Sequence, residues 1–361
     1  MLCSTRVPAA GSSCLVDLES GQTILSESSS DRIENTAIAA LMSAYTALAL
    51  AEERNESLDT PLADVSNKSE FRKSESNLAD AIEAVLLAAD KEALQAIVRH
   101  FSADEATFVI EMNTKAHQLG MEQSFFRTPY PSEKHLRNQT SAADAARLCI
   151  SLYQRYPLVR VWTSEEIVRF NNREIQNKNF FRQRSSAITG IFAYTNNESA
   201  NGIILAEDRR SNGRTRKLLA VALNENDRES LIERISTLLL RGYRDYETIR
   251  LYKSGDIVGS APVYKSNISK VKLKTVNDVF VSLTKERMLE LGEKAVNISI
   301  EYHNPIVAPL KAETNLGRLI ISVGDTIIST APVVAAEDAE RGGFLRRLTD
   351  TIKLAIYHQE K

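Results

Sequence analysis

The apolar pattern of the chain changes once, near residue 245. Before that point, helical periodicity alternates with a few strand-like runs. After it, Val, Ile and Leu recur in short alternating runs separated by Gly or Asn turns. A length of 361 residues is more than one typical hydrophobic core supports. We therefore predict a mixed helix-and-sheet domain over residues 1–245, a small all-β domain over 246–336 and a tail helix within 337–361.

Local signals predict the elements of the first domain. Thr36–Glu53 is rich in Ala and Leu and lacks Gly and Pro, which indicates a buried helix. Two antiparallel hairpins are expected, one turning at Ser20-Gly21 and one at Asn212-Gly213. Further helices are predicted over Leu78–His100, Ala103–Gly120, Ser141–Tyr153 and Asp227–Arg241, the last ended by Gly242.

The segment after Gly342-Gly343 is predicted to form an amphipathic helix, Phe344–Lys361. Its apolar side chains fall on one face at helical spacing, namely Phe344, Leu345, Leu348, Ile352, Ala355 and Ile356. At about 1.5 Å per residue, such a helix is too short to cross a bilayer comfortably. Two interpretations stay open: the apolar face lies in a membrane interface, or it packs on its own protein or a neighbour.

Charge and reactive side chains argue against several classes of function. A formal net charge of −2 disfavours nucleic-acid binding, which needs a strong positive excess. The basic run Arg209–Lys217 is interpreted as a solvated hairpin tip. The three cysteines show neither disulfide-framework nor metal spacing, and the five histidines are scattered, so no metal or other cofactor is expected. A pair between Cys3 and Cys14 stays open, and Cys149 is expected in the core.

No run approaches the roughly 18–20 apolar residues of a membrane span. The first residues, Met1–Thr5, lead almost at once into domain sequence and show no signal peptide. Either the protein is cytoplasmic, or a leader has been removed from this chain.

Several motifs, in the same order and spacing, resemble the low-molecular-mass penicillin-binding DD-carboxypeptidases. Leu15–Leu25 matches the opening hairpin of that family, and Met112-Asn113 with Leu119-Gly120-Met121 matches its MN..A..LGM segment. Ser141–Asp144 matches STA.D, and Asn177–Phe181 resembles the segment before the third catalytic motif. The chain is identified as a member of this family. The resemblance implies an α/β (α+β) fold, in which a β-lactamase-like domain with an antiparallel sheet flanked by helices precedes a small all-β domain.

The family catalyses acyl transfer from D-Ala-D-Ala with three motifs. S-x-x-K supplies a nucleophilic serine and a lysine that takes its proton, and S-x-N supplies a second hydroxyl and an amide. K-T-G lies on an edge strand that pairs with the substrate. At the positions that the resemblance assigns to these side chains, this sequence has Ala37, Ala40, Ala89, Lys91 and Ile188. Losing the nucleophile of such a unit costs on the order of 10⁶ in rate, so catalysis is expected to be lost.

Part of the third motif remains as Thr189-Gly190, which with Lys91 forms the predicted residual groove and edge strand. Lys91 is either an amine in that groove or a lysine on a helix surface. Ser269–Lys272 and Ser199–Asn201 formally match S-x-x-K and S-x-N. Ser269–Lys272 lies in an alternating strand of the second domain, where a serine and a lysine three residues apart point to opposite faces. Ser199–Asn201 lies beyond the third motif. Both are therefore interpreted as chance matches.

From these substitutions we predict that the chain is not an enzyme but a pseudoenzyme, acting as a binding, scaffold or regulatory protein of the bacterial cell envelope. Two alternatives stay open: a D-Ala-D-Ala carboxypeptidase with rewired residual activity, and a membrane-surface adaptor that works through the β domain and tail helix. The resemblance implies a periplasmic or other extracytoplasmic location, peripheral to the inner membrane. A protein partner or self-association is expected, with weak peptidoglycan binding, membrane contact through the tail and no nucleic acid.

Overall fold

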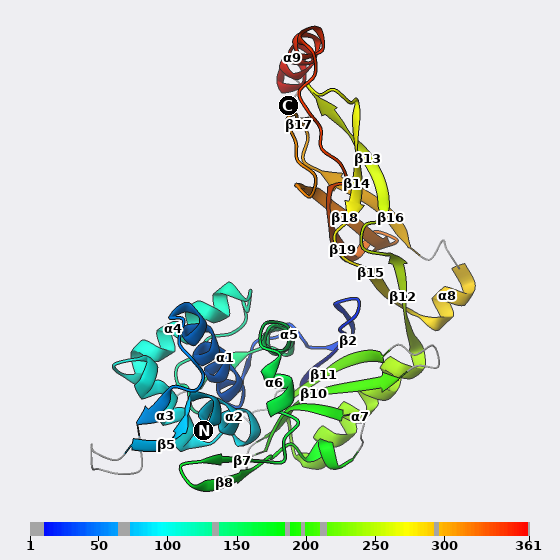
Figure 1. Cartoon of the computed structure of the whole chain (residues 1–361). Coiled ribbons are helices and arrows are strands. Elements are labelled where there is room, and N and C mark those ends of the chain that lie inside the picture. The colour runs from blue at the N-terminus through cyan, green and yellow to red at the C-terminus, as the bar shows by residue number, and fades with distance from the viewer. Residues whose placement is uncertain are drawn as a thin grey trace, which may run out of the picture. The chain divides into compact units, whose positions relative to one another are not determined.

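A computed structural model describes residues 11–63, 73–131, 137–184, 188–195, 199–209, 215–291 and 296–359 (Figure 1). The chain divides into two compact units, residues 1–18 with 23–244 and residues 19–22 with 245–361. Each unit has a hydrophobic core of its own.

The first unit is built on a five-stranded sheet in the order β2-β1-β11-β10-β9. Its strands are β1 (Ser12–Asp17), β2 (Gln22–Glu27), β9 (Ile188–Thr195), β10 (Ala200–Arg209) and β11 (Thr215–Glu225). The pairs β1–β11, β10–β11 and β10–β9 are antiparallel, with Leu15 opposite Ala220 and Ile204 opposite Ile191. The strands β2 and β9 therefore form the two edges of this sheet.

Helices lie on both sides of the sheet (Figure 1). They are α1 (Ile38–Glu53), α2 (Leu78–Ala88), α3 (Lys91–Phe101), α4 (Glu105–Gln118), α5 (Ala142–Arg155), α6 (Leu158–Trp162) and α7 (Arg228–Asp245), with the short 3₁₀ helix η1 (Phe180–Gln183). Three short strand pairs complete the unit, namely β3 (Ile33–Glu34) with β6 (Gln139–Thr140), β4 (Pro61–Ala63) with β5 (Lys73–Asn77), and β7 (Ile167–Phe170) with β8 (Arg173–Gln176).

Alternate residues of the central strands face two different cores. Cys14 and Val16 of β1 join the apolar cluster that contains α1, α2 and α5. Leu15, between them, joins Leu231 and Ile235 of α7 in a cluster on the other face. Because the sheet is buried on both faces, its central strands appear in the sequence as nearly continuous apolar runs. The predicted buried helix is confirmed, since the residues of α1 from 38 to 51 are all buried.

Two helix boundaries differ from the prediction. The helix expected over Leu78–His100 breaks at Ala89, whose backbone is left-handed with φ 52° and ψ 43°. Helix α7 does not end at Gly242 but continues to Asp245. A Cβ atom on Gly242 would lie 2.4 Å from Cδ2 of Leu15, so this glycine permits close packing of the helix on the sheet. The same residue type that ends many helices serves here as a contact point.

The prediction that the basic run Arg209–Lys217 forms a solvated hairpin tip is wrong for Arg216. Arg216 is buried and donates through Nε to Oδ2 of Asp17 at 2.7 Å and through Nη1 to the carbonyl oxygen of Gly242 at 2.9 Å. The expected turn at Asn212-Gly213 lies outside the described residues, although the strands that flank it pair as predicted.

The second unit is rich in strands. A six-stranded sheet has the order β16-β18-β19-β14-β13-β17, and β12 pairs with β15. The strands are β12 (Tyr246–Tyr252), β13 (Ile257–Tyr264), β14 (Lys270–Thr275), β15 (Val279–Thr284), β16 (Asn297–Tyr302), β17 (Ile306–Val307), β18 (Asn315–Val323) and β19 (Thr326–Ala335). Alternating residues such as Val271 and Leu273 of β14 fill its core, as the period of two predicts.

Two helices belong to this unit. Helix α8 (Lys285–Leu291) follows β15 directly and was not predicted. Helix α9 (Phe344–Gln359) begins at the predicted residue, and residues 360–361 lie outside the described part. Across the residues that the structure describes, no helix combines the length and apolar character needed to cross a membrane.

Candidate functional site

The first pair of candidate positions lies at the start of α1. Ala37 is the N-cap residue of the helix and Ala40 lies in its first turn, and both are buried. Ala37 makes no side-chain cap, and Oδ1 of Asn35 instead accepts a hydrogen bond from the backbone nitrogen of Ile38 at 3.2 Å. At these two positions the helix presents only methyl groups.

Three asparagines fasten this end of α1 to the sheet. Nδ2 of Asn35 donates to Oδ1 of Asn201 on β10 at 2.6 Å and to Oδ1 of Asn224 on β11 at 2.8 Å. The backbone nitrogen of Asn224 donates to the same oxygen of Asn201 at 2.9 Å. Asn201, which in the sequence is only part of a chance S-x-N match, therefore has a structural role. No local signal could show this, because Asn35 and Asn201 are 166 residues apart.

The second pair of candidate positions lies in the tight connection between α2 and α3. Ala89 adopts the left-handed conformation described above, which costs a non-glycine residue about 1–2 kcal/mol. The side chain of Asp90 then caps α3 by accepting from the backbone nitrogen of Ala93. Lys91 is the first residue of α3, and it is exposed. Its role as an amine in the groove stays a prediction.

Lys178, a residue that the sequence analysis did not single out, lies against the same connection. Its backbone nitrogen donates to the carbonyl oxygen of Leu87 at 2.9 Å, and its Nζ donates to the carbonyl oxygen of Ala88 at 3.1 Å. A cation at this point satisfies carbonyl groups at the C-terminal end of α2 and interacts favourably with the helix dipole. These bonds hold the segment that precedes β9 against the end of α2.

The third candidate motif opens β9. Ile188 begins this strand, and the side chain of Thr189 lies outside the described part. Gly190 has φ 114°, and a Cβ atom there would lie 2.8 Å from the carbonyl oxygen of Thr163. Thr163 in turn shares a hydrogen bond of 2.8 Å with the hydroxyl of Tyr153 and accepts from Nδ2 of Asn177 at 3.3 Å. Glycine is therefore required by packing and backbone conformation at this position.

Helix α2 links the three candidate positions. It packs against α1 on one side and contacts β9 on another, and the connection after it carries Ala89. The structure thus brings together elements that lie about 50 to 100 residues apart in the sequence, as the three-motif arrangement implies.

One carboxyl group on α2 titrates well above its ordinary range. Burial, reinforced by the charges of Glu165 and Asp80, raises the pKa of Glu83 to about 7. A carboxyl group with such a value exchanges protons near neutral pH. The sequence gives no sign of it, because the partner Glu165 comes from the segment after α6.

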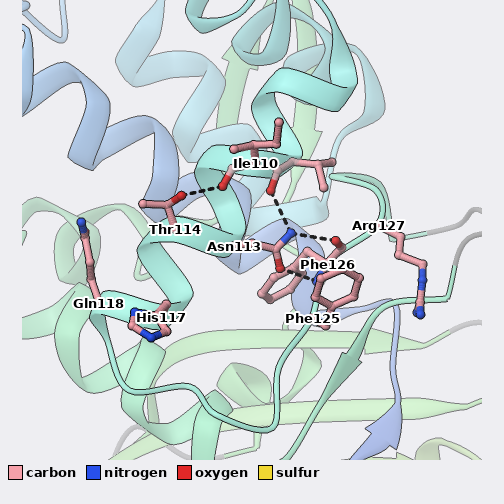
Figure 2. Close-up of a pocket in the computed structure, with 9 residues that line it drawn as sticks. Ile110, Asn113, Thr114, His117, Gln118, Phe125, Phe126 and Arg127 are labelled. Carbon is pink, nitrogen blue, oxygen red and sulfur yellow. Dashed lines mark hydrogen bonds between the residues drawn. The ribbon is translucent and has the colours of Figure 1, made fainter.

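A pocket of about 880 Å³ lies elsewhere in the unit, between α4 and the segment 125–127 (Figure 2). Figure 2 shows Asn113 between the helix and this segment: its Nδ2 donates to the carbonyl oxygens of Val109 and Phe126, and its Oδ1 accepts from the nitrogen of Phe126, each at 2.9 Å. Asn113 is thus committed to holding the loop. None of the lining residues belongs to α1, α2 or β9, so this pocket is separate from the candidate positions.

Metal-type ligands do not gather in the described residues, where no group of three or more His, Cys, Asp or Glu could hold an ion. Cys14 and Cys149 are both free and buried, which confirms Cys149 as a core residue, and Cys3 lies outside the described residues. Burial raises the pKa of the Cys14 thiol to about 12, so this thiol is not a reactive nucleophile.

The apolar face of the tail helix is exposed in this structure. The side chains of Phe344, Leu345, Leu348 and Ile352 are 70%, 76%, 51% and 56% exposed. The side chain of Ile356, the fifth predicted contact residue, lies outside the described part.

Comparison with known proteins gives two family matches. Residues 4–225 match the family described as D-alanyl-D-alanine carboxypeptidase, and residues 246–341 match the C-terminal domain of penicillin-binding protein 5. The D-alanyl-D-alanine carboxypeptidase DacF of Bacillus subtilis is 23% identical over 95% of this chain and 89% of its own length. DacD of Salmonella typhimurium is 24% identical over 75% of this chain and 67% of its own length.

Solved structures show the same fold. Penicillin-binding protein 5 from Haemophilus influenzae superposes with a TM-score of 0.74 at 19% identity, over 91% of this chain and 97% of that one. A peptidoglycan synthesis regulatory factor from Streptococcus pneumoniae gives 0.71 at 19% identity, over 91% and 98%. The predicted fold class is confirmed, with a DD-peptidase-like domain, a β-rich C-terminal domain and a C-terminal helix.

These matches correct one prediction. The expectation that the chain is not an enzyme, and with it the term pseudoenzyme, is contradicted, because the matched family and the relatives are named for an enzymatic activity. The expectation rested on five side chains in three short motifs, whereas the match extends over residues 4–225. Short motifs therefore did not decide the class of this chain.

Proposed function

The chain belongs to the D-alanyl-D-alanine carboxypeptidase family, and from this membership we propose that it acts in peptidoglycan metabolism in the periplasm. In this proposal an extended peptide binds along the outer edge of β9. The observation that carries the proposal is the position of β9 at the end of the sheet, where β10 is its one partner among the described strands. An edge strand offers unpaired N–H and C=O groups, and an extended peptide can add to it as a further strand.

The side chains around this edge suit a peptide that ends in a carboxylate. Nζ of Lys178 contacts Ala88 at the end of α2, the helix that contacts β9, and Lys91 begins α3 two residues after Ala89. An ammonium group can form a charge-assisted hydrogen bond with a terminal carboxylate such as that of D-Ala-D-Ala. In this proposal the edge strand binds the peptide backbone and a lysine binds its end.

Acyl transfer in this site would use a group other than the side chains of Ala37 and Ala40, because a methyl group neither attacks a carbonyl carbon nor carries a proton. Incubation with a fluorescent β-lactam, followed by intact-mass analysis and peptide mapping, would locate that group. A stoichiometric adduct on a serine, threonine or lysine would identify the nucleophile. Without an adduct, the function of the edge reduces to peptide binding.

Hydrogen–deuterium exchange tests the peptide site directly. A stem peptide ending in D-Ala-D-Ala is expected to slow exchange of amides in β9, and the same peptide ending in L-Ala-L-Ala is the control ligand. The strand β2, at the opposite edge of the same sheet, is the internal control and should not change. Equal slowing of amide exchange in β2 and β9, or no slowing in β9, would contradict the proposal.

A second function is favoured by the exposed apolar face of α9. We propose that Phe344, Leu345, Leu348 and Ile352 place this helix in a membrane interface, as a peripheral contact. Sedimentation with liposomes should recover the full chain but not a chain ended at Gly342. If both chains sediment equally, the helix packs on protein instead.

A further inference from the structure

A second pocket lies where α9 joins the β-rich unit. It has a volume of about 510 Å³ and is lined by residues of α9, of the segment just before α9 and of the β13–β14 connection, and by residues 307–308. Three of the lining side chains are cationic, namely Lys265, Arg341 and Arg347. None of the lining residues is acidic, and within the described part of the chain none of these three side chains forms an ion pair.

The apolar residues beside this pocket face the solvent. Phe344 and Leu348 line it from α9 and continue directly into the exposed face of the helix. Val307 of β17 lines it from the other side and is 40% exposed. A cluster of cations thus adjoins an unburied apolar surface, the combination found in proteins that contact the headgroup and acyl regions of a lipid at once.

The walls of the pocket are fixed rather than loose. Oδ2 of Asp350 on α9 accepts from the backbone nitrogen of Lys265 at 2.6 Å, and the nitrogen of Gly342 donates to the carbonyl oxygen of Lys265 at 2.8 Å. Nη2 of Arg346 donates to the carbonyl oxygen of Ile268 at 2.9 Å. These bonds hold the first turns of α9 on the β13–β14 connection. The ion pair that the structure gives Asp350 is with Lys353, at 4.0 Å, and not with one of the three lining cations.

We infer that this pocket binds the phosphate of an anionic glycerophospholipid, with the acyl chains lying against Phe344 and Leu348. A phosphate carries several acceptor oxygens, and a guanidinium group can meet two of them at once. The inference rests on the proposed membrane contact of α9. Beyond that proposal, the contact of α9 with the membrane is selective for anionic lipid, and the bound headgroup sets the orientation of α9 in the interface.

The test compares two substitutions on the same helix in the full chain. Arg347→Gln removes a cation that lines the pocket, and Lys353→Gln removes an exposed cation that does not. On vesicles of phosphatidylcholine with phosphatidylglycerol, we expect R347Q to lower the partition coefficient by more than tenfold. We expect K353Q to lower it by about fivefold, the effect of one surface charge. On pure phosphatidylcholine the two variants should bind alike.

Arg341→Gln is the second variant, because it removes a lining cation that lies outside α9 and should match R347Q. Equal losses for R347Q, R341Q and K353Q would overturn the pocket while leaving the membrane contact in place. Equal binding of the full chain and of the chain ended at Gly342 would instead overturn the membrane contact itself. Inorganic phosphate is the soluble probe: if it binds with the same dependence on Arg347 and anionic vesicles do not, the assignment to lipid is wrong.

Discussion

The carbonyl oxygen of Thr163 occupies the space that a side chain on Gly190 would need, 2.8 Å from an ideal Cβ position. This contact fixes the start of the edge strand β9 against the end of α6. The backbone of Gly190 also has a positive φ of 114°. The proposed peptide-binding edge therefore depends on a residue without a side chain.

Gly190→Ala should destabilise the first unit by about 2–4 kcal/mol, because it combines a steric overlap with a strained backbone. Gly120→Ala is the matched control in the same unit, since Gly120 also has a positive φ, of 71°, but has nothing within 4 Å of its Cβ position. The control substitution should lower the free energy of unfolding by about 1 kcal/mol. Urea unfolding followed by circular dichroism measures both variants. Equal losses of unfolding free energy would show that the steric overlap with Thr163 does not contribute.

Ala89→Gly should stabilise the first unit by up to about 1 kcal/mol, because glycine adopts the left-handed conformation without steric cost. Ala88→Gly is the neighbouring control within the helix, where glycine should destabilise by about 1 kcal/mol. Opposite signs in the two unfolding curves are expected. A loss of stability in both variants would mean that the methyl group of Ala89 contributes packing that outweighs the strain.

Asp17→Asn should lower the free energy of unfolding by about 3–5 kcal/mol, because it removes a buried negative charge 2.7 Å from Nε of the buried Arg216. Glu174→Gln breaks an exposed ion pair with Arg169 in the same unit and should lower the free energy of unfolding by less than about 1 kcal/mol. The ratio of the two losses, measured by denaturant midpoints, tests whether burial decides the value of an ion pair in this chain.

The free energy of unfolding should fall as the pH rises from about 4.5 to about 7, because the unfolded chain loses the proton of Glu83 before the folded chain does. The folded chain holds this proton to a pKa of about 7, against 4.5 for an ordinary glutamate, so the folded state binds more protons across this range. Glu83→Gln should flatten the slope and, after allowance for solvent screening, add about 1 kcal/mol at pH 7.

The control for this prediction is Glu165→Gln. Removing the charge of Glu165 should lower the pKa of Glu83 and weaken the pH dependence without abolishing it, because burial is the larger cause. Thermal unfolding between pH 4.5 and 8 measures all three proteins. An E83Q protein with an unchanged slope would contradict the assignment.

Elements whose signals are local were predictable from the sequence. The Ala-rich composition of α1, the cap formed by Ser141 before α5 and the face spacing of α9 each lie within one segment. The two missed boundaries have different causes. Gly242 packs against Leu15, which is distant in the sequence, instead of ending α7. Ala89 adopts a left-handed conformation, which an alanine in a sequence does not predict.

The candidate site was predictable in part. The order of the motifs identified the family. The third motif lies in β9 at one end of the sheet, and its role as a residual groove stays a prediction. The bonds of Lys178 at the end of α2 and the role of Asn201 depend on contacts between distant segments, which a pattern in one segment cannot show. The class of the protein was misjudged because a few substituted side chains outweighed the larger match.

The pairing of β1 with β11 has a consequence for the growing chain. Ser12 lies opposite Leu223, so a central strand of the sheet is made roughly 200 residues before its partner exists. At about 5–20 residues per second, synthesis leaves that gap open for roughly 10–40 seconds. Throughout this interval β1, whose six residues all end up buried, has only β2 beside it, and its other edge waits for β11. A nascent chain of this protein should therefore need protection by a chaperone until β11 has emerged.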